Sequence, residues 1–169
     1  MAQTAFINPL TVTQAAGTDT VAWNLQGATP QAQDGNRCGS TEPLRAINLL
    51  ANLTGQRTTH TLLFGGFDLS AVSGTVQGIA VRVFASKQSR CRDHLVQLYH
   101  NGALVGANRA TAAAGDEHTY GSSADLWGTQ LTANQLQTIS VALAYESGVM
   151  PHQDHMYVDT VQLQVNYTP

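Results

Sequence analysis

The chain has 169 residues and a formal net charge of −3 at pH 7, and its charged fraction of 11% is far below the roughly 25% typical of soluble domains. Lys87 is the single lysine, so the chain lacks the clustered cations that phosphate binding needs, which argues against nucleic acid and membrane as partners. No stretch approaches the ~20 apolar residues of a membrane span, and no secretory signal is visible, so we expect assembly in the cytosol.

The N-terminal residues 1–19 differ from the rest of the chain because apolar and polar residues alternate little in them. The segment is rich in Thr, Gln and Ala and contains Pro9. We expect an N-terminal arm that is ordered against a neighbouring molecule or not at all. Residues 20–169 are then one domain, long enough to bury a substantial core.

Two short strands are predicted in the first part of this domain. Both TVAWNL (20–25) and THTLLFGGFDL (59–69) alternate apolar and polar residues with the period of a strand. The intervening EPLRAINLLANLTG (42–55) also fits a helix face that begins at Pro43, but we expect a strand or irregular structure there.

The middle of the chain carries a longer strand and a hairpin. TVQGIAVRVF (75–84) alternates with a change of register near Gly78 that indicates a β-bulge, and Arg82 is expected to point outward. In HLVQLYHNGALVG (94–106), the dipeptide Asn101-Gly102 favours a type I′ turn, which needs positive φ at both central residues.

The C-terminal third adds two strands and one helical turn. TISVALAY (138–145) and MYVDTVQLQVNY (156–167) alternate strongly. In the second of these, one face is predicted to carry Tyr157, Val161, Leu163, Val165 and Tyr167. Thr132 and Gln135 have the spacing of a capping box, so a short helical connector is expected before residue 138.

These elements predict an all-β fold class. Seven to eight short strands with at most one short helical turn are typical of an antiparallel β-sandwich, and we expect it to be jelly-roll-like. The two cysteines, Cys38 and Cys91, lack the spacing of a zinc or redox motif. Without an export signal, two free thiols are favoured over a disulfide.

The segment YGSSADLWG (120–128) places a tryptophan in a Gly/Ser/Asp loop. Its glycines permit unusual backbone shapes, Asp125 can accept hydrogen bonds from nearby amides, and Trp127 can fold back to plug one end of the sandwich. The alternative is an exposed ligand site formed by Trp127, Tyr120 and Asp125. We favour the buried plug, because a lone tryptophan beside a strand boundary is more often a core residue.

A second polar constellation lies in PHQDHMYVD (151–159). His152, Asp154 and His155 are residue types that bind zinc or another divalent ion, and Asp159 follows them. On an extended segment, His155 and Asp159 would lie about 13 Å apart, too far to share one ion without a turn. A polar loop that contacts a neighbour is therefore the preferred interpretation.

Enzymatic chemistry is not indicated by any motif. Asp93-His94 and Asp116-Glu117-His118 provide acid and imidazole pairs, but nothing in the sequence orders them into a site. There is no nucleophile elbow, zinc-protease motif, phosphate loop or dinucleotide fingerprint. We expect a protein that is not an enzyme and takes no cofactor.

Five segments together resemble a family of β-sandwich domains found in tailed-phage virion proteins and some bacterial surface proteins. In chain order they are VAWNLQGATPQAQDGNRC, LLFGGFDLSAVSGTVQGIAVRVFAS, DHLVQLYHNGALVGANRAT, YGSSADLWG and YVDTVQLQVNY. The resemblance covers about residues 20–168. Cys38, Cys91 and VMPHQDHMY lie outside the pattern.

The resemblance implies a structural component of a bacteriophage virion, either a head decoration or a tail-associated protein. Its partners would be copies of itself, with a trimer favoured, and other virion proteins. Neutral amides and hydroxyls on the surface suit such contacts, since charge is depleted at the centre of protein interfaces. The alternative function is a carbohydrate-binding or adhesive module in which Trp127, Tyr120 and Asp125 bind a host glycan.

Overall fold

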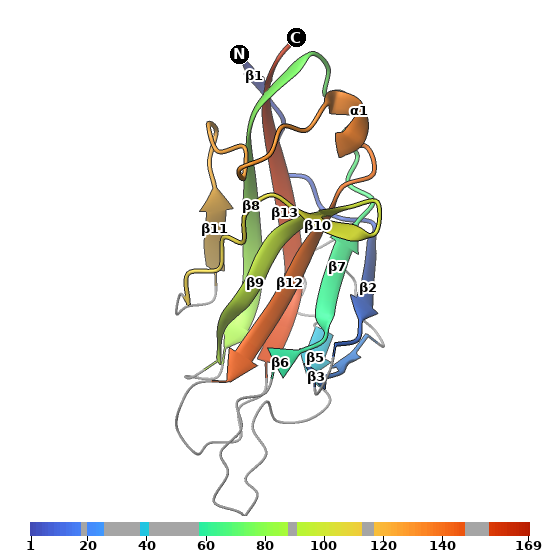
Figure 1. The fold of residues 1–169 in the computed structure, drawn as a ribbon, viewed down its shortest axis with the longest axis vertical. Helices are drawn as coiled ribbons and strands as arrows, with labels where there is room; N and C mark the ends of the chain where they lie inside the picture. The colour runs from blue at the N-terminus through green and yellow to red at the C-terminus, as the bar shows by residue number, and fades with distance from the viewer. Residues whose placement is uncertain (18–19, 26–37, 41–57, 88–90, 113–116, 148–155) are drawn as a thin grey trace, which may run out of the picture.

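The computed structural model describes residues 1–17, 20–25, 38–40, 58–87, 91–112, 117–147 and 156–169, without the side chains of 38–40, 86–87 and 147. These residues form strands and one helical turn (Figure 1). The elements are β1 (Ala2–Gln3), β2 (Thr11–Ala15), β3 (Thr20–Val21), β4 (Trp23–Asn24), β5 (Cys38–Ser40), β6 (Thr58–Thr59), β7 (Thr61–Gly65), β8 (Thr75–Lys87), β9 (Cys91–His100), β10 (Ala103–Val105), β11 (Glu117–Gly121), α1 (Ala133–Leu136), β12 (Ser140–Ser147) and β13 (Met156–Thr168).

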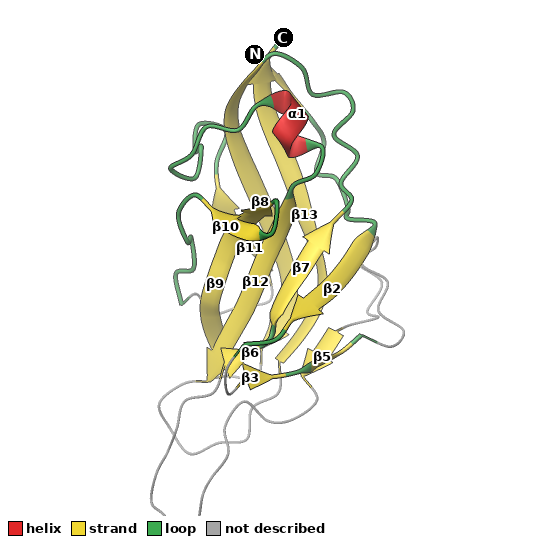
Figure 2. Cartoon of the chain, turned by 45° about the vertical axis from the view of Figure 1, so that its right-hand side comes forward, coloured by secondary structure: helices red, strands yellow, loops and turns green. Residues whose placement is uncertain are grey.

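The strands form two sheets. Sheet A is six-stranded, with the order β11-β8-β13-β5-β4 and with β1 beside β13. Sheet B is seven-stranded: β10, β9 and β12 lie side by side, β7 and β6 both pair with β12, and β2 and β3 follow outward. The two chain ends and α1 lie at the same end of the molecule (Figures 1 and 2). Among the described residues, no helix has the length and apolarity to cross a bilayer.

The pairing of the main strands is that of a jelly roll. Four antiparallel pairs nest along the chain: β5 with β13, β7 with β12, β8 with β11, and β9 with β10. The β8–β13 contact joins two of the pairs into sheet A, and the β9–β12 contact joins the other two into sheet B. This arrangement of eight strands confirms the predicted jelly-roll-like sandwich.

The two-residue turn, the helix cap and the β-bulge predicted from the sequence are confirmed at the predicted positions. Asn101 and Gly102 have φ of 50° and 82° and connect β9 to β10 as a two-residue turn. Thr132 and Gln135 form the capping box that begins α1. The register of β8 changes between Val76 and Gly78, which places the expected bulge there. The segment 42–55 lies outside the described residues.

The inward faces of the sheets make one continuous core. Strand alternation turns the apolar residues of β7, β8, β9, β12 and β13 toward the opposite sheet, where they are buried. The largest fully buried side chains include Trp127, Tyr145, Phe64, Leu62 and Leu143. Trp23 also lies in the core, its ring at 70° to that of Tyr145 and 6.4 Å away between centroids.

The predicted face of β13 is correct except at its start. Val161, Leu163 and Val165 are buried, as expected. Between Val158 and Thr160 the extra residue of the bulge lies on β13, so the start of the strand is out of phase with the middle, whereas the shift beside Tyr167 lies on β8 and leaves the phase of β13 unchanged. The prediction that Tyr157 faces the core with Val161 is therefore wrong, while half-buried Tyr167 packs against the core as expected.

The expected N-terminal arm is also wrong. In this structure residues 1–17 pack on their own domain: β1 pairs with β13, Ile7 exchanges two backbone hydrogen bonds with Leu163, and β2 pairs with β7. The physical reason is that the segment can form backbone hydrogen bonds along one side of β13 and along one side of β7. The weak alternation of residues 1–10 concealed this role, because backbone pairing needs no particular side chain.

Gln14 fixes the segment to the body of the domain. Its side chain accepts a hydrogen bond from the Trp23 amide at 2.8 Å and donates one to the Trp23 carbonyl at 3.0 Å. The same Gln14 oxygen lies 3.1 Å from Nδ1 of His60, whose carbonyl accepts a bond from the Trp23 indole at 2.7 Å. Segments far apart in the chain are therefore held together by one amide group.

Candidate functional site

The loop that carries Trp127 is a structural plug. Trp127 has an exposed fraction of 0%, and its Nε1 donates to the Ile79 carbonyl at 2.9 Å. The preferred interpretation of this indole as a core residue is confirmed. Its faces are covered, so it offers no exposed surface on which a sugar ring could stack.

Asp125 holds the loop in place from the outside. One of its oxygens accepts a 2.7 Å hydrogen bond from the Trp127 amide and a 2.6 Å bond from Nη2 of Arg109. Its carbonyl accepts a 2.9 Å bond from the Ile79 amide, which extends the edge of sheet A beyond β11. The carboxylate of the predicted site is thus satisfied within the domain and orients a buried side chain.

Tyr120 belongs to a different, buried polar cluster. Its hydroxyl donates a hydrogen bond to Oδ2 of Asp93, which is only 4% exposed. Burial, and then the hydrogen bond and charge of Asp93, raise the pKa of Tyr120 above its ordinary value. Burial also raises the pKa of Tyr145, and the charges of Asp93, Tyr120 and Cys91 raise it further. The three predicted ligand residues therefore do not converge on one surface.

Sequence reasoning missed the role of Asp93, which it paired with His94. The two lie on opposite faces of β9, and the register shift against β12 beside Tyr145 puts Asp93, and not His94, on the inward face. Asp93 enters the core, while the Nδ1 of His94 lies 3.0 Å from Oε2 of Glu146 on the outside. Alternation alone assigns neighbouring residues to opposite faces, but only the bulge decides which one is inside.

The candidate metal residues cannot be placed. His152, Asp154 and His155 lie outside the described residues, so a metal site there stays a prediction. Within the described ranges, no three His, Cys, Asp or Glu side chains gather as a metal-binding set. Cys91 is buried, but the side chain of Cys38 is not described, and their predicted thiol state likewise stays a prediction.

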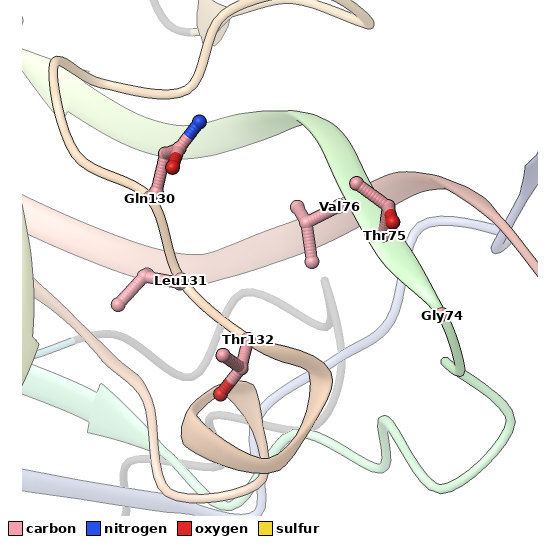
Figure 3. Close-up of a pocket in the computed structure, with 6 residues that line it drawn as sticks. All are labelled: Gly74, Thr75, Val76, Gln130, Leu131 and Thr132. Carbon is pink, nitrogen blue, oxygen red and sulfur yellow. The ribbon is translucent and has the colours of Figure 1, made fainter.

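A small hollow lies at the end of the sandwich near α1. Its volume is about 310 Å³, and Figure 3 shows the segments on either side of it, the start of β8 and the residues before α1. It is lined by Gly74, Thr75, Val76, Gln130, Leu131 and Thr132. None of these side chains titrates, so the hollow provides hydroxyl, amide and apolar contacts and no group for acid–base chemistry.

A second hollow is a groove of about 380 Å³ on the outer face of sheet B. Hydroxyls of Thr20, Thr58 and Thr61 and the amide of Asn108 surround it, and Ala144 lies in it. Its size is at the lower end of the range for small-molecule sites. Sequence reasoning missed this groove because its lining comes from several strands that are distant in the chain.

The groove adjoins a larger surface of uncharged residues, here called the neutral face, and His94, which pairs with Glu146, also lines the groove. It consists of outward residues of β2 and β7 and of residues 95–99 of β9 and 140–144 of β12, which the strand registers place in adjacent rows. The ion-paired Arg92, His94 and Glu146 lie at the far end of β9 and β12, outside this face. Its members are Thr11, Thr13, Ala15, Thr61, Leu63, Gly65, Leu95, Gln97, Tyr99, Ser140, Ala142 and Ala144. The face is made of hydroxyl, amide and apolar groups only.

The arginines in the described part of the chain form ion pairs within the domain. Each arginine whose side chain is described has a carboxylate partner: Arg82 with Glu117 at 3.3 Å, Arg92 with Glu146 at 2.5 Å, and Arg109 with Asp125 at 2.6 Å. Arg82 also lies 3.9 Å from the centroid of the Phe6 ring. Positive charge on these strands is thus compensated within the domain.

Comparison of the chain with protein-family models, with curated proteins and with solved structures found no match. The fold defines the class, an all-β jelly-roll sandwich.

Proposed function

We propose that this protein is a non-enzymatic structural component of a bacteriophage virion, a head decoration or tail-associated subunit that contacts copies of itself and other virion proteins. The single observation that carries the proposal is the neutral face. An uncharged sheet surface can be covered by another protein without desolvating ions, and charge is depleted at the centre of protein interfaces.

Two further features support this proposal. Jelly rolls recur in viral capsid proteins, where strand pairing leaves broad sheet faces for contacts between subunits. The motifs of residues 20–168 resemble a phage virion family in the same order along the chain.

The experiment is quantitative mass spectrometry of purified phage particles encoded by the same genome. We expect many copies per particle, in a fixed ratio to the major capsid or tail protein. Absence of the chain from washed particles, while it is present in the lysate, would contradict the proposal.

A matched pair of variants links particle binding to the neutral face. Leu63 lies in the face beside Ala142, and Leu63→Lys should reduce incorporation because it adds a charge that a partner would have to desolvate. The control is Thr119→Lys, at an exposed position of β11 in sheet A. Equal incorporation of both variants would show that the neutral face is not the contact.

A carbohydrate-binding module is a second candidate, favoured by the groove rather than by the residues predicted from sequence. The groove presents threonine hydroxyls, the Asn108 amide, the His94 imidazole and apolar side chains, which are groups that can bind an uncharged sugar. Titration of neutral mono- and disaccharides by NMR tests it. Ala144→Leu should abolish any shifts by filling the groove, whereas Ala103→Leu at an exposed position of β10 should not.

A further inference from the structure

Sheet edges differ in how far they are protected from pairing with another chain. An edge strand presents unpaired backbone groups, and proteins usually blunt such edges with charges, proline, bulges or very short strands. In sheet A the outer strands are β4, with two residues, and β11, which bears the ion-paired Glu117. At one edge of sheet B, β10 has three residues.

The opposite edge of sheet B is shared by the two-residue β3 and by β2, and β2 has none of these devices. β2 spans the five residues Thr11–Ala15, and among the described residues only β7 pairs with it. Its ladder with β7 runs from Thr11 opposite Gly65 to Ala15 opposite Thr61 without a register shift. The strand contains no proline or glycine, and residues 1–17 contain no charged side chain.

The burial pattern of β2 is that of a strand with an open flank. Thr11, Thr13 and Ala15 are exposed, and even the inward Val12 and Gln14 are only half-buried. The outward three belong to the neutral face, so this edge continues an uncharged surface. A further strand laid beside β2 would meet backbone hydrogen-bonding groups, methyl groups and hydroxyls, and no charge.

The sequence of β2 is complementary to itself in the antiparallel direction. With two copies centred on Thr13, Thr11 lies opposite Ala15, Val12 opposite Gln14, and Thr13 opposite Thr13 of the second copy. Threonine pairs are favourable cross-strand neighbours, and like charges are absent. A contact of this kind has the two-fold symmetry in which the same patch serves both partners.

We propose that two copies of this chain associate through antiparallel pairing of their β2 strands about a two-fold axis at Thr13. Sheet B then runs continuously through both copies, and their neutral faces form one extended surface. The inference rests on the proposed function in that it names one of the contacts between copies. The inference predicts a two-fold contact between copies, whereas the resemblance to phage modules favoured a trimer.

A five-residue strand on each side buries a small area, so the dimer is expected to be weak and concentration-dependent in solution. Sedimentation velocity and light scattering of the full chain over a concentration series should show a reversible monomer–dimer equilibrium. Thr13→Lys and Thr13→Glu should each remain monomeric at every concentration, because each places like charges opposite one another.

The decisive measurement is the equimolar mixture of the Thr13→Lys and Thr13→Glu variants. If the two Thr13 side chains face each other, opposite charges restore the dimer, which contact through any other surface would not do. Thr119→Lys is the control and should dimerise as the unmodified chain does. Circular dichroism and the unfolding midpoint of each variant should match the unmodified chain, since Thr13 is exposed.

Three outcomes would overturn the inference: an unmodified chain that stays monomeric, a dimer or trimer that survives Thr13→Lys, or a mixture that fails to reassociate. The particle measurement separates this result from the proposed function. A chain abundant in virions that forms no β2 dimer would retain the proposed function without this contact. A chain that forms the β2 dimer but is absent from virions would retain this contact and contradict the proposed function.

Discussion

Replacing Trp127 with alanine is expected to lower the free energy of unfolding by about 3–5 kcal/mol. The side chain is fully buried, and its removal leaves both a cavity and the Ile79 carbonyl without its indole donor at 2.9 Å. Domains are typically stable by about 5–15 kcal/mol, so this one change removes a large share. At about 2–4 °C per kcal/mol for a chain of this size, the melting temperature should fall by roughly 6–20 °C.

The backbone at Trp127 makes a second comparison informative. Its φ is 58°, in the left-handed region, which costs a residue with a β-carbon about 1–2 kcal/mol. Trp127→Ala retains that strain and Trp127→Gly relieves it. The glycine variant should therefore be more stable than the alanine variant by about 1 kcal/mol, which reverses the usual order in which glycine is about 0.5–1 kcal/mol worse.

Urea unfolding followed by far-UV circular dichroism measures both differences, and the fluorescence of Trp23 provides a second probe. The midpoint should shift without a change in the denaturant slope. The control is Leu104→Ala, at a residue that is 47% exposed, which should stay within about 0.5 kcal/mol of the unmodified chain. A loss below about 1 kcal/mol in Trp127→Ala, or a glycine variant clearly weaker than the alanine variant, would refute the reasoning.

Three further changes test other parts of the domain. Gly78→Ala would place a β-carbon 2.3 Å from the backbone carbon of Ser123, which cannot move freely, so we expect a loss of about 3 kcal/mol by thermal or urea unfolding. Tyr120→Phe should lose about 1–3 kcal/mol at neutral pH, because buried Asp93 loses its hydroxyl donor. Since the pKa of Tyr120 is raised, the unfolded chain loses this proton first, and the urea midpoint should fall above about pH 10, less steeply in Tyr120→Phe. Thr132→Ala should lose about 1 kcal/mol by removing the cap of α1.

Two of these predictions have a control variant, and the third has an outcome that would contradict it. Gly102→Ala meets no atom within 4 Å and should lose less than Gly78→Ala, although its φ of 82° still disfavours alanine. Thr132→Ser keeps the capping hydroxyl and should be nearly neutral. If the urea midpoint falls as steeply above about pH 10 in Tyr120→Phe as in the unmodified chain, groups other than Tyr120 cause that fall.

The sequence by itself determined the all-β class, the main strands and the local turns. Alternation in residues 75–84 and 138–145, the Asn101-Gly102 turn and the Thr132 capping box each depend on residues adjacent in the chain. Such signals need no knowledge of distant partners, because period and turn chemistry act within a few residues. The interpretation of Trp127 as a core residue followed from the same local context.

The tertiary structure decided which residues meet. It brought Asp93 to Tyr120, divided the predicted ligand residues between a buried plug and a buried polar cluster, and assembled the groove and the neutral face from distant strands. It also placed residues 1–17 on both sheets and reversed the facing of Tyr157 through a bulge. Each outcome depends on register between strands far apart in the chain, and a slip of one residue turns every side chain to the other face.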